Sequence, residues 1–210
     1  MRTSLHASDG SRLEECVAGG GVAVFPTDTV YGLCCDPEDE DAARRLYELK
    51  GRAATRACAV MFFALEPALL TLSELTDAER VALRALLPGP VTVLLANRGG
   101  QFAAACRSDP WTLGLRVPRL PDPLSALRSI SAPVMQSSAN ISGEPDARSL
   151  QAVPARVLDG ADLVLDGGEL PGVPSTVVDL RDFDSERRWH LLREGALARQ
   201  EVQELFDAAG

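Results

Sequence analysis

The stretch Val22–Leu33, which reads VAVFPTDTVYGL, decides how we interpret the fold. Its first four residues are apolar and predict a buried strand over 22–25. Pro26 ends this strand, because proline has no N–H to donate to a neighbouring strand. Thr27 to Gly32 then supply two hydroxyls, a carboxylate and a phenol beyond the strand's carboxyl end. Open α/β sheets bind ligands at that edge, so this stretch predicts a sheet with a binding site.

A second feature is the triplet Lys50-Gly51-Arg52, which follows the next predicted helix. Lys50 is the only lysine in the sequence, and the other 20 of its 21 basic residues are arginines. A compact ammonium and a planar guanidinium are not interchangeable at a binding site, which favours a functional role for this lysine. The alternative is a solvated cation at a helix C-terminus, where the dipole favours either residue by about 0.3–1 kcal/mol.

The rest of the chain alternates between predicted helices and strands. We expect helices over 8–18, from the acidic run at 36–41 to Lys50, over 76–87, after Asp122 and over 196–206. We expect further strands over 59–63, 91–96, 112–117, 133–135, 163–165, 177–180 and 189–192. The chain contains no internal repeat or low-complexity linker, and 210 residues can bury the core of one domain. This order predicts an α/β fold with a mixed sheet.

Two segments have two interpretations each. The run Asp36–Asp41, DPEDED, could be a cluster of metal ligands, but we favour the first turn of a helix, where carboxylates complement the dipole. The segment Gln136–Gly143, QSSANISG, follows a short predicted strand. It is either a turn or a phosphate-contacting loop, and its composition alone favours the turn.

Composition excludes several classes of protein. The formal net charge of −9 argues against nonspecific binding along nucleic acid, although a local basic cleft is compatible with it. The five cysteines form no CxxC pair and there are two histidines, so neither a zinc site nor a disulfide framework is expected. We find no signal peptide and no apolar run of membrane-spanning length, and we therefore expect a cytoplasmic protein.

The residues that could carry chemistry are cations and small polar side chains. Neither histidine lies near a recognisable nucleophile loop, and no GxxxxGK[ST] or strand-linked GxGxxG motif occurs. Such groups suit a polyanionic substrate that is bound without covalent catalysis, as in phosphoryl or nucleotidyl transfer. Those that follow predicted strands or helices are Thr29, Lys50, Arg52, Arg56, Arg116, Ser138, Asn140, Arg148, Ser175, Thr176 and Arg193.

Seven motifs together resemble the YrdC-like family of threonylcarbamoyl-AMP synthases. In chain order they are FPTDTVYGL, LKGR, LPGPVTVLL, LGLRVP, SSANISG, PSTVVD and LREGAL, and they extend from about Gly20 to Ala196. The resemblance implies a single YrdC-like domain over 1–210, without the C-terminal extension domain of longer members. It also implies a twisted mixed β-sheet flanked by helices, with a concave, positively lined cavity.

Members of this family condense L-threonine, bicarbonate or CO2, and ATP into threonylcarbamoyl-adenylate and pyrophosphate. A partner complex then transfers the threonylcarbamoyl group to a tRNA adenosine. The resemblance therefore implies ATP as a substrate, accompanied by Mg²⁺ without metal ligands from the protein. The carbamate formed from threonine is itself a nucleophile, so no Ser, Cys or His is required, and cations would offset the charge at phosphorus.

Positions that match the family motifs imply roles for individual residues. Lys50 and Arg52, the K-x-R pair, would be catalytic, and they form the family signature together with Ser138 and Asn140. Arg116 would bind the threonine carboxylate. The implied threonine-binding residues are Thr29, Tyr31, Arg116, Ser138 and Ser175. The implied ATP-binding residues are Arg52, Arg56, Thr112, Asn140, Arg148, Thr176 and Arg193.

The loop after Arg52 departs from the family pattern. Relatives usually have proline at Ala53 and a Pro-Leu or Pro-Ile pair at Ala57-Cys58, and many have a polar residue or histidine at Met61. We therefore expect a more mobile loop over the nucleotide.

A diverged paralogue that acts as a non-catalytic RNA- or nucleotide-binding module is the main alternative, although negative charge and few aromatics weigh against RNA binding. A second alternative is the related domain of hydrogenase-maturation carbamoyltransferases. That domain belongs to much longer chains with zinc-finger-like cysteines, and this sequence shows neither feature.

Overall fold

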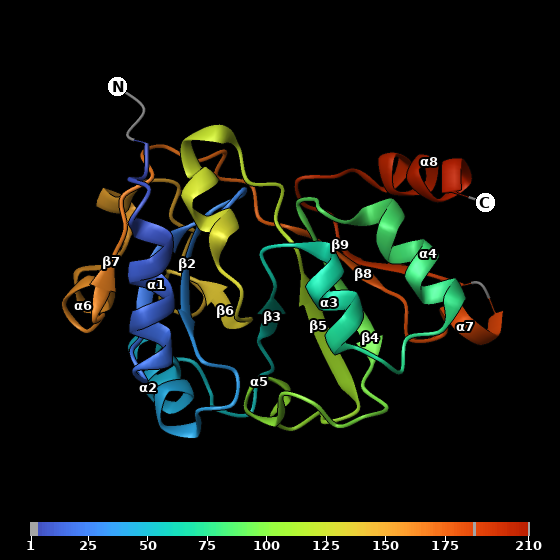
Figure 1. The fold of residues 1–210 in the computed structure, drawn as a ribbon, viewed down its shortest axis with the longest axis horizontal. Coiled ribbons are helices and arrows are strands. Elements are labelled where there is room, and N and C mark those ends of the chain that lie inside the picture. Colours follow the sequence, from blue (N-terminus) through green and yellow to red (C-terminus); the bar gives the residue numbers. More distant parts are fainter. Residues whose placement is uncertain (1–3, 187, 210) are drawn as a thin grey trace.

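A twisted sheet of nine strands forms the centre of the computed structural model, which describes residues 4–186 and 188–209 (Figure 1). The strands in chain order are β1 (Ala23–Pro26), β2 (Tyr31–Cys35), β3 (Ala59–Met61), β4 (Val91–Ala96), β5 (Thr112–Arg116), β6 (Val134–Ser138), β7 (Leu163–Val164), β8 (Thr176–Asp179) and β9 (His190–Arg193). Their order across the sheet is β7-β1-β2-β6-β3-β5-β4-β8-β9. The pairs β1–β7, β3–β5 and β4–β8 are parallel and the others antiparallel, so the predicted mixed sheet is confirmed.

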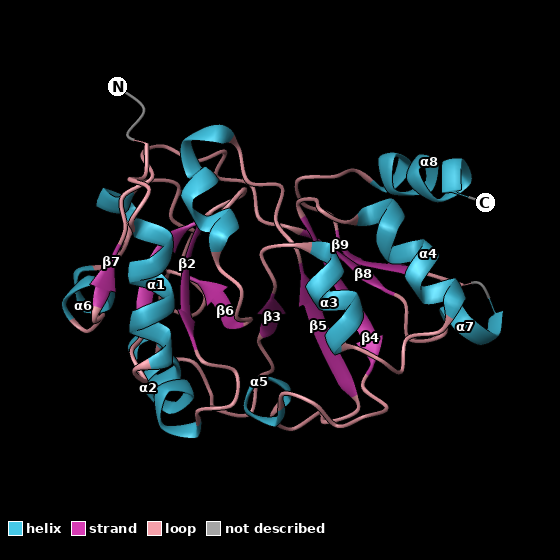
Figure 2. Ribbon diagram, viewed as in Figure 1, coloured by secondary structure: helices cyan, strands magenta, loops and turns pink. Residues whose placement is uncertain are grey.

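Helices flank this sheet, as Figure 2 shows. They are α1 (Asp9–Ala18), α2 (Glu40–Lys50), α3 (Leu65–Thr71), α4 (Asp77–Leu86), α5 (Ala103–Cys106), α6 (Ala155–Asp159), α7 (Phe183–Glu186) and α8 (Arg199–Ala209), with 3-10 helices η1 (Asp122–Ser129) and η2 (Leu150–Ala152). Helix α1 packs against β1 and η1, α2 against β2, and α4 against α8. None of the helices within the described ranges combines the length and the apolar character needed to cross a bilayer.

Helix α2 forms where its capping residues predict it. The Asp39 side chain accepts hydrogen bonds from the N–H groups of Asp41 and Ala42, so the acidic run is a cap and a first turn, as predicted. Gly51 has φ +56°, a left-handed conformation that glycine adopts without strain, and it ends the helix. These two caps place Lys50 in the last turn, beside the sheet.

Alternation along the central strands separates two faces of the sheet. Leu95 and Leu113 lie beside Leu72, just after α3, in the apolar core. The intervening residues, such as Leu94 and Thr112, face away from α3. One face of the sheet is therefore covered by helices, and the other is available for a cavity.

Strand β2 begins at Tyr31, so the polar stretch that follows β1 ends at Val30, and Tyr31 and Gly32 pair with β1. Two local predictions differ from the structure. The segment from Gln136 to Ser138 belongs to β6 and pairs with β2, so the turn that composition favoured is wrong for these residues. The helix predicted after Asp122 is a 3-10 helix.

Candidate active site

A cavity of about 370 Å³ lies on the face of the sheet that turns away from α3. Three alternate residues of β5, Thr112, Gly114 and Arg116, form part of its floor. Its volume lies within the range of about 300–1,000 Å³ that is typical of small-molecule sites. Seven of the predicted site residues line it, namely Thr29, Arg52, Thr112, Arg116, Ser138, Ser175 and Arg193.

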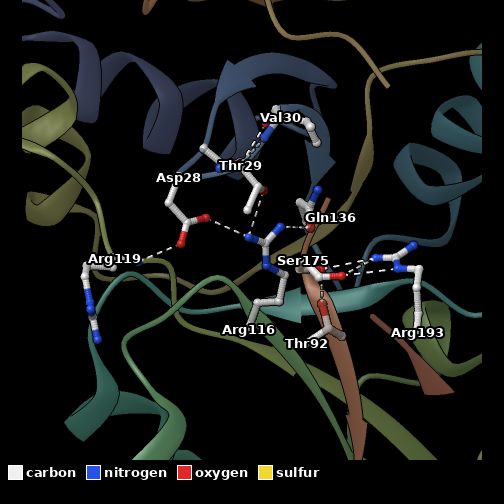
Figure 3. Close-up of polar contacts among 10 residues, drawn as sticks. Asp28, Thr29, Val30, Thr92, Arg116, Arg119, Gln136, Ser175 and Arg193 are labelled. Atoms are coloured by element: carbon white, nitrogen blue, oxygen red, sulfur yellow. Dashed lines mark hydrogen bonds and ion pairs between the residues drawn. The ribbon is translucent and has the colours of Figure 1, made fainter. Parts of the chain in front are cut away.

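One end of the cavity is built around the buried guanidinium of Arg116. Its Nη2 donates to Asp28 Oδ1 at 2.7 Å and to Thr29 Oγ1 at 3.2 Å (Figure 3). Its Nη1 makes a long contact of 3.4 Å with Gln136 Oε1. Two segments, the turn between β1 and β2 and strand β6, therefore hold this arginine, which is 3% exposed, and place a cation beside a hydroxyl at the cavity wall.

The Asp28–Arg116 ion pair is largely removed from water. Burial raises the pKa of the Asp28 carboxyl, and Arg116 and the backbone N–H of Arg119 oppose that rise. Burial also lowers the pKa of Arg116, while Asp28 favours its charged form. Because an arginine pKa starts so high, the guanidinium is charged at neutral pH. This end of the cavity therefore offers fixed positive charge with one counter-ion.

Lys50 lies directly behind the cavity wall and is 2% exposed. Its Nζ donates to Ser138 O, to Asn140 O at 3.0 Å and to Asn140 Oδ1 at 2.9 Å. Ser138 Oγ donates to the same Asn140 Oδ1 at 2.7 Å. The three signature residues Lys50, Ser138 and Asn140 thus form one hydrogen-bonded cluster, and of these three Ser138 lines the cavity.

The pKa of Lys50 predicts a pH effect on stability. Burial, with the nearby Arg52 as a smaller cause, lowers this pKa from 10.5 to about 8. The unfolded chain then binds the proton more tightly, so the cost of the buried ammonium is present below pH 8 and is relieved as the pH rises toward 10.5. We expect the free energy of unfolding of the wild type, relative to Lys50→Met, to rise by about 1–3 kcal/mol between pH 7 and pH 10.

Urea denaturation of both proteins at the two pH values measures this difference. The comparison with Lys50→Met removes the contributions of cysteines and tyrosines, because both proteins contain the same ones. A difference that stays constant or falls with pH would show that Lys50 keeps an ordinary pKa in the folded protein.

Arg52 lines the cavity next to this cluster. Its Nη1 donates to Ser137 Oγ at 3.3 Å and its Nη2 to Ala57 O at 2.7 Å. Two further hydrogen bonds hold the loop between Arg52 and Ala57. The Tyr47 hydroxyl donates to Arg56 O at 2.5 Å, and the Ser108 hydroxyl donates to Thr55 O at 2.6 Å. Hydrogen bonds therefore fasten the loop after Arg52, which was expected to be more mobile.

The opposite side of the cavity is formed around β8 and β9. Ser175 Oγ lies 2.8 Å from Thr92 Oγ1 (Figure 3). Arg193 donates through Nε and Nη2 to Ser175 O, at 3.2 and 2.8 Å. Thr176 is fully buried, and its Oγ1 donates to Leu197 O at 2.6 Å. It fastens the segment after Arg193 and does not line the cavity.

Several predicted residues lie outside the cavity lining. Asn140 is turned toward Lys50, and Arg148 pairs with Glu169 on the surface at 2.7 Å. Arg56 is exposed. Tyr31 is fully buried, and its hydroxyl lies 2.8 Å from Gly168 O and accepts from the Gly167 N–H at 3.0 Å. Tyr31 therefore lies in the core and does not line the cavity, and its threonine-binding role stays a prediction.

This placement makes Tyr31→Phe informative. The change removes the hydroxyl that joins β2 to the segment 166–168, so we expect the free energy of unfolding to fall by about 1–3 kcal/mol. We expect the Kd for L-threonine, the ligand that the motif resemblance implies, to stay within about twofold. Thermal denaturation and calorimetric titration with L-threonine measure the two effects, and a large rise in that Kd would instead support the predicted binding role.

Sequence reasoning missed several cavity residues. Gln136 was assigned to a turn, although it lies on β6 and contacts Arg116. Thr92 lines the cavity from β4, and its place between Val91 and Val93 is the alternation signal that could have indicated it. Asp146 also lines the cavity. Its carboxylate belongs to no sequence pattern that we could interpret.

The described residues contain no group of three or more His, Cys, Asp or Glu side chains that could hold a metal ion. The charged residues at the cavity wall are Arg52, Arg116 and Arg193 with Asp109 and Asp146. The wall thus carries more cations than carboxylates, and Lys50 lies behind it. Such a site suits a ligand that carries anionic groups.

Comparisons with known proteins identify relatives over most of the chain. The family Sua5_yciO_yrdC, described as "Telomere recombination", matches residues 15–195. The threonylcarbamoyl-AMP synthase of Xanthomonas campestris pv. campestris (strain B100) is 33% identical over 180 residues, which cover 84% of this chain and 95% of that protein. That of Pyrococcus abyssi is 31% identical over 196 residues, which cover 89% of this chain.

The chain spans about half the length of the Pyrococcus protein, 54% of it. Among solved structures, that of P. abyssi Sua5 complexed with L-threonine superposes with a TM-score of 0.83 at 28% identity. This match covers 98% of the present chain and 59% of the Pyrococcus one. The match to the family over residues 15–195 and the shared fold show that this chain belongs to the Sua5/YciO/YrdC family.

Proposed function

We propose that this chain is an L-threonylcarbamoyladenylate synthase, which condenses L-threonine, bicarbonate or CO2, and ATP into threonylcarbamoyl-AMP and pyrophosphate. One observation carries the proposal: a single cavity is lined by the buried Arg116 and Thr29 together with Arg52 and Ser138, and Ser138 is hydrogen-bonded to the Lys50–Asn140 pair behind the wall. The first group suits an amino-acid carboxylate, and the second suits phosphates. The relatives named threonylcarbamoyl-AMP synthase support the same activity.

The amino-acid substrate would bind at the Arg116 end. Arg116 and Thr29 would hold its carboxylate and leave its amine directed into the cavity. The amine attacks CO2 and loses a proton, which forms a carbamate. The structure of P. abyssi Sua5 complexed with L-threonine supports an amino-acid site in this fold.

The second step is transfer of the adenylyl group. A carbamate oxygen attacks the α-phosphorus of ATP, the bond to the β-phosphate oxygen breaks, and pyrophosphate leaves. Arg52 would offset charge on the phosphates, and Lys50 would hold the Ser138–Asn140 segment against them. ATP would enter as its Mg²⁺ complex, so the metal ion arrives with the substrate. This assigns the enzyme to the nucleotidyltransferases.

The product is a reactive mixed anhydride, so the threonylcarbamoyl group would pass to a second enzyme. We propose that a transferase complex in the cytoplasm moves this group to a tRNA adenosine, and that the present chain meets tRNA only through that complex. The names of the relatives do not favour the alternative of a non-catalytic RNA-binding module.

Pyrophosphate release tests the proposal. The purified protein is incubated with ATP and Mg²⁺, with and without L-threonine and bicarbonate, and the nucleotide product is identified by mass spectrometry. We expect release that requires both co-substrates and yields threonylcarbamoyl-AMP. ATP binding without turnover would indicate a diverged paralogue, and salt-sensitive RNA binding without ATP binding would contradict the enzyme.

A further inference from the structure

We propose that Asp28 is a positioning residue, which aims the Arg116 guanidinium at the carboxylate of the amino-acid substrate. The inference rests on the proposed function, because it concerns the amino-acid end of the same cavity. Asp28 does not line that cavity among the described residues, and Arg116 does. Asp28 would therefore act through Arg116 and not on the substrate itself.

The geometry around Asp28 is that of a two-sided clamp. Its Oδ1 accepts from Arg116 Nη2 at 2.7 Å, and its Oδ2 accepts from the backbone N–H of Arg119 at 2.9 Å (Figure 3). The two paired side chains are 4% and 5% exposed. One carboxylate thus fixes both the guanidinium at the end of β5 and the backbone that follows this strand.

The clamp also joins distant parts of the sheet. Asp28 lies in the turn between β1 and β2, and Arg116 is 88 residues away in the sequence. Strands β6 and β3 lie between β2 and β5 in the sheet. Among the described residues, the side-chain hydrogen bonds of Arg116 go to Asp28 and Thr29 of this turn and, over a longer distance, to Gln136 of β6, so these contacts from other parts of the sheet direct the guanidinium.

The remaining contacts of Arg116 show what the clamp leaves available. Nη2 has two hydrogens, and Asp28 and Thr29 accept from it. Nε is buried without a partner among the described residues. Nη1 has only the long 3.4 Å contact with Gln136. Nη1 and Nε therefore each keep a hydrogen for a ligand, and the clamp on Nη2 determines where both nitrogens point.

Loss of Asp28 should change threonine binding in opposite directions if Asp28 is only a counter-ion and if it is a positioning residue. Asp28 offsets the charge of Arg116, and removal of a nearby negative charge should by itself strengthen the binding of a carboxylate. Removal of a positioning group should weaken it, since a misplacement of about 1 Å can reduce catalysis by about 100-fold. The sign of the change in threonine affinity therefore separates the two roles.

The test is the kinetics of Asp28→Asn and Asp28→Glu in the pyrophosphate assay. We expect both changes to raise the KM for threonine by about tenfold or more, with the KM for ATP changed by less than about twofold. Asp28→Glu keeps the charge but lengthens the side chain, so a role in charge alone predicts no effect there. An unchanged or lower KM for threonine in both variants would overturn the inference.

A matched control uses Glu79, a fully buried carboxylate that pairs with Arg98 at 3.0 Å and does not line the cavity. We expect Glu79→Gln to lower stability while the KM for threonine stays unchanged. A cycle with Arg116→Gln completes the design, because Asp28→Asn should add no further loss of threonine affinity in that background. A further loss would show that Asp28 acts independently of Arg116.

Failure of the proposed function and failure of the positioning role of Asp28 give different results. If the wild type releases no pyrophosphate with threonine, the proposed function fails. If the wild type is active and Asp28→Asn does not fold, Asp28→Glu decides the positioning role.

Discussion

Lys50→Ala is expected to reduce threonine-dependent pyrophosphate release by about 100-fold or more, since a misplacement of about 1 Å in the Ser138–Asn140 segment that Lys50 holds can have an effect of this size. The Lys50 ammonium donates to Ser138 O, Asn140 O and Asn140 Oδ1. Alanine leaves these oxygens without that donor and removes a cation from behind the cavity wall. We also expect the free energy of unfolding to fall by about 2–4 kcal/mol. The pyrophosphate assay and urea denaturation measure the two effects.

Lys50→Arg tests why the single lysine of this chain stands here. Its charge is retained, but a planar guanidinium cannot direct three donors at three converging oxygens in a site that is 2% exposed. We expect it to lose activity nearly as strongly as Lys50→Ala. Arg44→Ala, an exposed cation on the same helix, serves as the control and should keep wild-type activity. Wild-type rates for folded Lys50→Ala would refute the assignment of this residue.

Arg116→Lys is expected to raise the KM for threonine by about 10- to 100-fold, with a smaller effect on the KM for ATP. An ammonium can still pair with Asp28, so the buried carboxylate keeps a partner and the fold survives. It lacks the fork of donors that allows one side chain to hold Asp28 and a substrate carboxylate together. Steady-state kinetics with threonine and ATP varied separately measure both constants.

The control for this prediction is Arg98→Lys. Arg98 also pairs with a buried carboxylate, that of Glu79, but it lies away from the cavity. Arg98→Lys should leave the KM values for threonine and ATP unchanged. If Arg116→Lys raised the KM for ATP as much as that for threonine, Arg116 would belong to the nucleotide site.

Local rules explain why much of the fold was predictable. A run of four apolar residues predicted β1, and an acidic first turn predicted a helix that ends at Lys50. Alternation in β5 separated Arg116 from the core residues beside it. Thr76 and Glu79 form a capping box at the start of α4, where a helix over 76–87 was expected. Each of these signals depends on residues within a few positions of one another.

The sequence by itself thus determined the fold class, most elements and, through ordered motifs, the family. Only the tertiary structure decided that Gln136 lies in a strand, because β6 pairs with β2, and that the Tyr31 hydroxyl is used within the core. It also decided that Asp28 holds Arg116 and that Lys50 faces Asn140, 90 residues away. A buried donor or acceptor forms a hydrogen bond with the group that the tertiary fold places next to it. Local sequence does not specify that partner, since the competing donors and acceptors come from strands distant in the chain.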